Sequence, residues 1–172
     1  PSLLSWAAMV CEKLEEPILQ QSFLVRYLDL NESPDVRLSL ARALLTQKNL
    51  TEAERHLRAL LAGSPAHAEG LLLRGVLCMQ REQYREAEHS FLLAMRQGAD
   101  RKTCLMGMGM AALGRAYAQG AWEQFLQVLA EHPDDAEAVH WLLRAGTAQN
   151  RWAELCGDPR QYMSRNPGDR AV

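Results

Sequence analysis

The sequence predicts an all-α protein built from repeated helix pairs, and three observations support this fold class. Residues of matching size recur at a step of 34 along most of the 172-residue chain. Between them, apolar residues follow the spacing of one face of a helix. Serine, proline and glycine fall where such helices should begin and end. A period of this length is typical of stacked helical units that bury their apolar faces against one another.

The period is visible in four rows of equivalent positions. One row is mostly proline, two rows are mostly small residues, and one row is mostly large and apolar. In chain order the rows read Pro65, Ala99, Pro133 and Pro167; Ala53, Ala87, Ala121 and Leu155; Ala41, Gly75, Gly109 and Leu143; and Leu57, Phe91, Phe125 and Pro159. A small residue, then alanine, an aromatic residue four further on and a closing proline resemble the tetratricopeptide repeat. This resemblance implies a right-handed α-solenoid of about ten helices in antiparallel pairs.

Five expected units divide the chain at this step, with helix A in the first half of each unit and helix B in the second. They cover residues 1–33, 34–67, 68–101, 102–135 and 136–169, which predicts a single domain with no room for a separate catalytic one. The two outer units are degenerate, as capping repeats are. In the first unit, Pro17 opens the second helix. In the last unit, Asp158-Pro159 should break helix B.

Turn residues mark the expected helix boundaries of the three regular units. Ser33-Pro34 and Ser64-Pro65 each have an N-cap serine followed by proline at the first helical position. Thr51 and Glu54 have the spacing of a capping box at the start of a helix B. These signals predict helix starts near the beginning and the middle of each unit.

Glycines inside helix A are interpreted as packing residues. We expect close helix crossings at Gly75 with Ala87 and at Gly109 with Ala121, since a helical glycine costs about 1 kcal/mol that packing must return. The run from Gly107 to Ala112 also satisfies a loose GxGxxA pattern. A dinucleotide site needs a strand before that pattern, whereas the repeat places it inside a helix. The sequence therefore predicts packing here, and no cofactor.

Composition and charge exclude several classes of function. The net charge is −2 and the basic residues are scattered, so we expect no nucleic-acid partner. No apolar run is long enough to span a bilayer and no signal peptide is visible, so we expect no membrane insertion. The five histidines do not pair at metal-ligand spacing, and no catalytic arrangement of nucleophile and base can be inferred. We expect no metal, no cofactor and no enzymatic activity.

The source and the cellular compartment of the chain can be inferred from its cysteines, its composition and its first residue. Cys11, Cys78, Cys104 and Cys156 are far apart and form no CxxC pair, so free buried thiols and a reducing, cytoplasmic compartment are expected. The chain is rich in alanine, leucine and arginine, which suggests a bacterial source. It begins with Pro1 and not with methionine, and we expect it to be a segment of a longer protein.

The surface with a predicted function is the concave groove that the resemblance implies, lined by residues of helix A. Its expected lining combines apolar residues with charged residues at the rim. The groove residues are Leu38, Arg42, Glu69, Leu73, Val76, Met79, Met106, Met110, Leu113, Trp141 and Arg144. Methionine side chains are flexible and suit surfaces that adapt to apolar partners. The alternative is that this apolar stripe is buried within the array or beneath a terminal helix.

These expectations together predict a non-enzymatic scaffold or adaptor. Its partner is expected to be a protein or peptide, bound in the groove as a helix or an extended segment, with a second copy of this chain as one option. The alternative is a regulatory or self-associating repeat module of a larger enzyme, secretion or biosynthetic complex.

Overall fold

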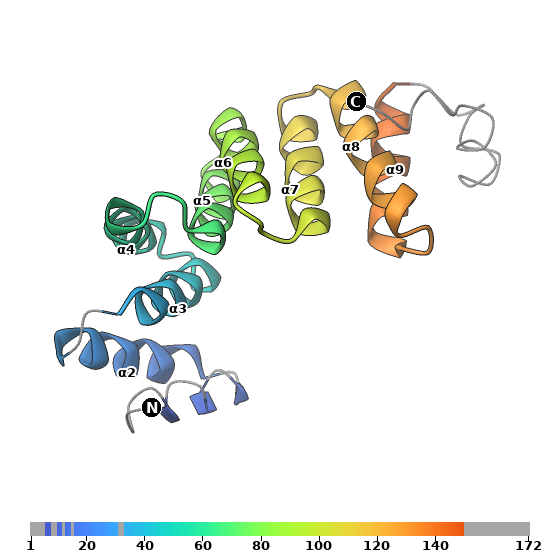
Figure 1. Ribbon diagram of the computed structural model, residues 1–172. Helices are drawn as coiled ribbons and strands as arrows, with labels where there is room; N and C mark the ends of the chain where they lie inside the picture. The colour runs from blue at the N-terminus through green and yellow to red at the C-terminus, as the bar shows by residue number, and fades with distance from the viewer. Residues whose placement is uncertain (1–5, 8–9, 12, 15, 31–32, 150–172) are drawn as a thin grey trace.

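The computed structural model describes residues 6–7, 10–11, 13–14, 16–30 and 33–149, which form helices and short turns (Figure 1). Helices α2 to α9 span Pro17–Leu30, Pro34–Thr46, Leu50–Gly63, Ala68–Gln80, Tyr84–Arg96, Arg101–Gly114, Ala118–Glu131 and Ala136–Ala148. Each helix packs against the next, and α3, α5, α7 and α9 also contact one another in turn. The result is a curved row of antiparallel helix pairs, with α2 and α9 at opposite ends (Figure 1). The predicted all-α solenoid is confirmed.

The helix starts follow the 34-residue step. From α4 onward helices B begin 34 residues apart, and helices A begin 33 to 35 residues apart. The helix A starts are Pro34, Ala68, Arg101 and Ala136, and the helix B starts are Leu50, Tyr84 and Ala118. The period in the sequence is therefore the period of the helix pairs.

The turns from α3 to α4, from α5 to α6 and from α7 to α8 each contain one residue with a left-handed backbone. Lys48, Glu82 and Ala116 have φ angles of 57°, 59° and 60° and are themselves 34 residues apart. In the first turn, the backbone N–H of Asn49 donates to the carbonyl of Leu44 at 2.9 Å, and equivalent bonds close the next two turns. This is the bond pattern of a Schellman turn, which satisfies carbonyls at the end of helix A. The same local geometry reverses the chain in each of these three units.

Two predicted helix caps are wrong. The N-cap of α4 is Asn49, whose side chain accepts the backbone N–H three residues later at 3.4 Å. The chain reversal at Lys48 is complete at Asn49, so α4 begins at Leu50. Thr51 therefore lies inside the first turn of the helix and does not cap it. Ser64 is the C-cap of α4, and α5 is capped instead by Nδ1 of His67, which accepts a backbone N–H at 3.1 Å. Pro34 does begin α3.

The aromatic side chains of the helix B row lie between two neighbouring helices A. Phe91 of α6 is 3% exposed, and its ring lies against Gly75 of α5 and Gly107 of α7. A Cβ atom added at Gly75 would lie 2.6 Å from the ring, and one at Gly107 would lie 2.7 Å from it. The space that Gly75 leaves is thus taken by the Phe91 ring, whereas the prediction paired this glycine with Ala87.

The next unit repeats this arrangement with one difference. Phe125 is fully buried against Gly109, where an added Cβ would lie 2.5 Å from its ring. Its other neighbour is Trp141 of α9, with ring centroids 6.4 Å apart and planes inclined by 22°. Trp141 occupies the position equivalent to Gly107, so ring packs on ring here. One apolar layer therefore connects each unit to the next.

Candidate partner-binding site

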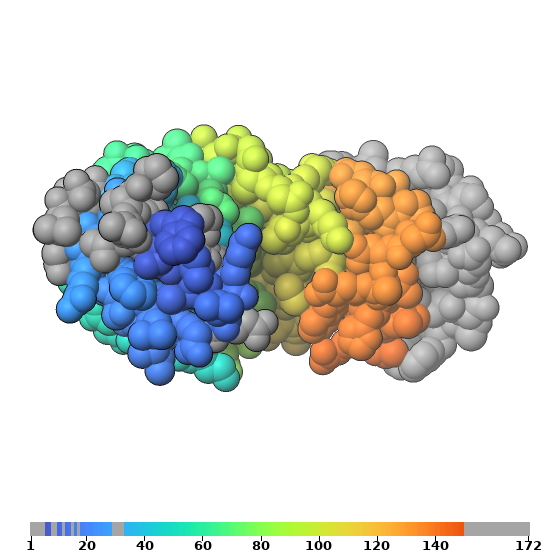
Figure 2. All heavy atoms as spheres, turned by 90° about the horizontal axis from the view of Figure 1, so that it is seen from below, coloured from blue at the N-terminus to red at the C-terminus, as the bar shows by residue number. Residues whose placement is uncertain are grey.

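The predicted groove residues lie on α3, α5, α7 and α9, which contact one another in turn along one face of the stack. In the space-filling view of Figure 2, the middle helices are set back between the blue N-terminal part and the orange α9. The row of helices A therefore crosses the hollowed side of the curved array.

Eleven residues were predicted to line this groove, and they differ in exposure. Leu38, Leu73 and Met106 are only 6%, 7% and 5% exposed, so they are core residues and the prediction is corrected for these three. Leu73 belongs to the same apolar cluster as Leu57, at the position where the next unit has Gly107. The half-buried residues are Val76, Met79, Met110, Leu113 and Trp141, and the exposed ones are Arg42, Glu69 and Arg144.

Several positions of helix A are accessible in all four units, and one of them lies in the second half of each helix, between the ends. It holds Arg42, Val76, Met110 and Arg144, each 34 residues from the next. The two central side chains are apolar and half-buried, and the two outer ones are charged and exposed. We call these four residues the central row. It offers two apolar anchors between two cations.

A cleft of about 660 Å³ opens beside the central row, at the N-terminal ends of α5 and α7. Arg42, Glu69, Leu72 and Thr103 are among the residues that line it. Arg42 Nη2 donates to Glu69 Oε1 at 2.5 Å, which links α3 to α5. Both side chains are about half exposed, at 46% and 54%. Exposed ion pairs contribute about 0–1 kcal/mol to folding stability. Charged groups of a partner can therefore replace the pair of Arg42 with Glu69 at little cost in free energy.

The cleft also has an acidic edge. Asp100 caps α7, and its Oδ2 accepts both the backbone N–H of Thr103 at 2.8 Å and the hydroxyl of Thr103 at 2.5 Å. The hydrogen bond from the hydroxyl has the larger effect and the one from the backbone the smaller, and both lower the pKa of Asp100 below its usual value of 3.8. Glu69 lies in the first turn of α5. Carboxylates at helix N-termini are stabilised by the helix dipole, and they favour a partner with basic groups.

The far end of the central row is an aromatic and cationic surface. The guanidinium of Arg144 lies 4.8 Å from the centre of the Trp141 ring. His140 meets the same ring edge-on, with centroids 5.7 Å apart. Arginine on tryptophan contributes about 0.5–1 kcal/mol at exposed sites, and it holds Arg144 in place. Tryptophan and arginine are also the residue types most often found at the centres of interfaces.

The residues that the structure describes show neither a metal centre nor a membrane span. No group of three or more His, Cys, Asp or Glu side chains in them is arranged to hold a metal ion. None of the helices that the structure describes has the length and apolar character needed to cross a membrane. Cys11, Cys78 and Cys104 are buried free thiols, while Cys156 lies outside the described residues, as does Asp158-Pro159.

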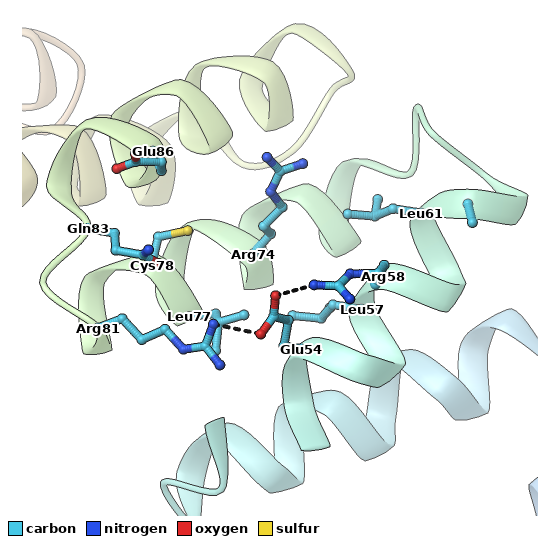
Figure 3. A pocket seen from close by; sticks show the side chains of 11 residues that line it. Glu54, Leu57, Arg58, Leu61, Arg74, Leu77, Cys78, Arg81, Gln83 and Glu86 are labelled. Carbon is cyan, nitrogen blue, oxygen red and sulfur yellow. Dashed lines mark hydrogen bonds and ion pairs between the residues drawn. The ribbon is translucent and has the colours of Figure 1, made fainter. Parts of the chain in front are cut away.

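Sequence reasoning missed a second hollow, of about 530 Å³, which α4, α5 and the start of α6 enclose (Figure 3). Arg58 and Arg74 line it. The repeat did contain a signal for it, because the equivalent residues of the next unit are Leu92 and Met108.

Comparison with known proteins identifies the fold. No protein-family model matches the chain, and no curated protein matches it in sequence. Solved structures with a similar fold include a tetratricopeptide repeat protein from Parabacteroides merdae, PilF of Pseudomonas aeruginosa, and PilW, a widely conserved type IV pilus biogenesis factor. Their sequence identities are 15%, 16% and 19%, and their TM-scores are 0.78, 0.78 and 0.69.

The superpositions cover 99%, 98% and 78% of this chain, and the chain spans 65%, 76% and 63% of the three proteins in the same order. At these identities the likeness concerns the fold and does not extend to partners. The chain therefore has the tetratricopeptide-repeat fold that its 34-residue period predicts.

Proposed function

We propose that this chain is a non-enzymatic scaffold that binds a segment of a partner protein along the row of helices A. The observation that carries the proposal is the central row, with apolar Val76 and Met110 between Arg42 and Arg144. The flanking cleft adds volume beside this row and an acidic edge at Glu69 and Asp100. Tetratricopeptide-fold proteins are in general protein-interaction scaffolds, which agrees with this proposal.

The geometry defines the chemistry of the partner segment. Two apolar side chains of a helix or strand would anchor on Val76 and Met110. An acidic residue would pair with Arg144, which is exposed. A basic residue would displace Arg42 from Glu69 or bind at Asp100. Such a segment combines apolar anchors near its centre with opposite charges at its two ends.

The test compares substitutions that introduce a carboxylate on and off the central row. Val76→Glu/Met110→Glu should abolish capture of partner proteins from a lysate by the immobilised chain, because an apolar anchor cannot bury a carboxylate. The matched control is Leu92→Glu, a half-buried leucine on α6, in the other helix layer. It should leave capture intact. Circular dichroism melts of all three proteins check that each is folded.

Two outcomes would contradict the proposal. If both variants capture the same proteins as the unmodified chain, the central row does not bind them. If Leu92→Glu alone loses them, the binding surface lies on the helix B side of the array.

The alternative, a repeat module of a larger secretion or biosynthetic complex, rests on a separate observation. PilW, whose fold is similar, is a type IV pilus biogenesis factor. The same capture experiment distinguishes the two proposals. Recovery of pilus or secretion components through the central row favours the module, and recovery of unrelated soluble proteins favours the free-standing adaptor.

A further inference from the structure

The pocket between α4, α5 and α6 is separate from the groove. It shares no lining residue with the cleft beside the central row. Its volume of about 530 Å³ lies within the range of about 300–1,000 Å³ that is usual for ligand sites. Figure 3 shows it from close by, with α4 on one side and α5 and α6 on the other. It does not depend on the function proposed above.

The pocket exists because this junction lacks large apolar side chains that fill the later junctions. Where α6 meets α7, the equivalents of Leu57, Arg58 and Arg74 are a phenylalanine, a leucine and a methionine. Where α8 meets α9, they are a phenylalanine and two leucines, all buried. In chain order these fillers are Phe91, Leu92 and Met108, then Phe125, Leu126 and Leu142. Accordingly, α4 packs less extensively on α5 than α6 does on α7.

The charged side chains at the pocket differ in whether they already form ion pairs. Glu54 accepts from both Arg58, at 2.5 Å, and Arg81, at 2.7 Å, as the dashed lines of Figure 3 show. The pair of Glu54 with Arg81 recurs 34 residues later as Glu88 with Arg115, so it belongs to the repeat framework.

Of the three arginines that line the pocket, Arg74 is the one that does not pair with Glu54. Within the described part of the chain it makes no ion pair and no side-chain hydrogen bond. Its side chain is exposed and, in Figure 3, extends from α5 away from Glu54. The thiol of Cys78, also labelled there, points toward the middle of the pocket and is 7% exposed.

We propose that this pocket binds a single carboxylate carried on an apolar stem. Arg74 holds the carboxylate, with help from donors of Arg58 that Glu54 leaves unused, because a guanidinium has five N–H groups. The stem lies along Leu61 and Leu77, which line the pocket. Such a ligand is a glutamate side chain of a partner protein, or a free short-chain carboxylic acid of the same chemistry.

The charge of the lining favours a carboxylate over a phosphate. Three arginines and two glutamates line the pocket, so its formal charge is 3 − 2 = +1. One carboxylate neutralises this charge. A phosphate group, with a charge of about −1.5 to −2 at neutral pH, exceeds it and is repelled by the two glutamates.

The test titrates three probes into the 172-residue chain labelled in its leucine methyl groups, followed by NMR. The probes are hexanoate, a capped Leu-Glu-Leu peptide, and the same peptide with glutamine. We expect saturable shifts of the Leu61 and Leu77 methyl signals with at least one of the first two probes. The Leu142 signals, at another junction, should not move. Which of the two probes binds identifies the source of the carboxylate.

Variants separate this site from general surface binding. Arg74→Gln should weaken binding at least tenfold, and Arg96→Gln, which removes an exposed arginine of α6 that does not line the pocket, should leave it unchanged. Leu57→Phe/Arg74→Met copies residues of the next unit into this junction, and it should abolish binding while the helical circular dichroism spectrum is kept.

Three results would overturn the proposal. One is the absence of saturable shifts with both carboxylate probes. Another is equal binding of the glutamine peptide, or of inorganic phosphate when it is titrated into the chain in the same way. The third is binding that survives both Arg74→Gln and the filled variant.

Discussion

The ring of Phe91 between two glycines allows a stability change to be worked out from the structure. Gly75→Ala places a Cβ 2.6 Å from that ring, at least 0.8 Å inside the 3.4 Å at which ordinary contact begins. The ring is 3% exposed and has Gly107 on its other face, so it cannot move aside. Overpacking of this kind costs about 1–3 kcal/mol. Alanine in place of a helical glycine returns about 1 kcal/mol.

The net expectation is a loss of about 0–2 kcal/mol, centred near 1 kcal/mol. For a chain of this length that lowers the melting midpoint by about 2–4 °C. Urea denaturation and thermal melts measure the change directly. The control is Gly63→Ala at the end of α4, where an added Cβ would meet nothing within 4 Å. This variant should be neutral or stabilised by up to about 1 kcal/mol.

A double mutant tests the contact itself. Gly75→Ala/Phe91→Leu reproduces the combination that the preceding unit already has, Ala41 with Leu57, both almost fully buried. The smaller side chain makes room for the Cβ, so the double variant should be more stable than the sum of the two single changes predicts, by at least about 0.5 kcal/mol. Strict additivity, or a Gly75→Ala variant as stable as Gly63→Ala, would refute the placement of the ring.

Three further predictions follow from local geometry. Ala116→Gly should stabilise the chain by about 1 kcal/mol in urea denaturation, because the left-handed backbone at φ 60° is strained for alanine and free for glycine; an unchanged midpoint would contradict this. The hydrogen bond from Arg81, foremost, lowers the pKa of Glu54 below 4.5. The ionised Glu54 carboxylate therefore contributes its full stabilisation above about pH 4.5, and this contribution is lost as the pH falls through the lower pKa of the folded state. Glu54→Gln should accordingly reduce the loss of unfolding free energy that is measured on the acid side. Burial raises the pKa of the Cys78 and Cys104 thiols, so both should react slowly with iodoacetamide at neutral pH and rapidly in urea, and mass spectrometry should show no change on reduction.

The fold could be predicted because its signals are local and repeated. The 34-residue step places the helix starts, since each unit reverses through the same left-handed residue at Lys48, Glu82 or Ala116. The caps were less predictable, because several side chains near a helix start can cap it. Asn49 and Thr51 are two residues apart, and only the backbone turn decides that Asn49 is the cap.

The groove was only partly predictable, for a different reason. A repeat position indicates which helix face a side chain occupies, but its burial depends on the size of residues in the neighbouring units. Leu73 and Gly107 hold equivalent positions. Leu73 fills the space beside Leu57, which is smaller than a phenylalanine, whereas Gly107 leaves space for the ring of Phe91. The pocket at Arg58 and Arg74 was not predicted because it arises where these two residues depart from the repeat pattern. The prediction of sites rested on residues that match the pattern.

The reduced packing of α4 on α5 has a consequence for how the array opens. A linear array is held together by the interfaces between neighbouring units, so its least filled interface is the place where it separates first. The block from α2 to α4 should then open without α5 to α9, and native-state hydrogen exchange would show one shared opening free energy for amides of α3 and α4, below that of α6 to α8. A seam of this kind lets the curvature change at a single point while the blocks on either side stay rigid. The array would then behave as two stiff arms joined by a hinge, whose angle a ligand in the pocket at that seam could set.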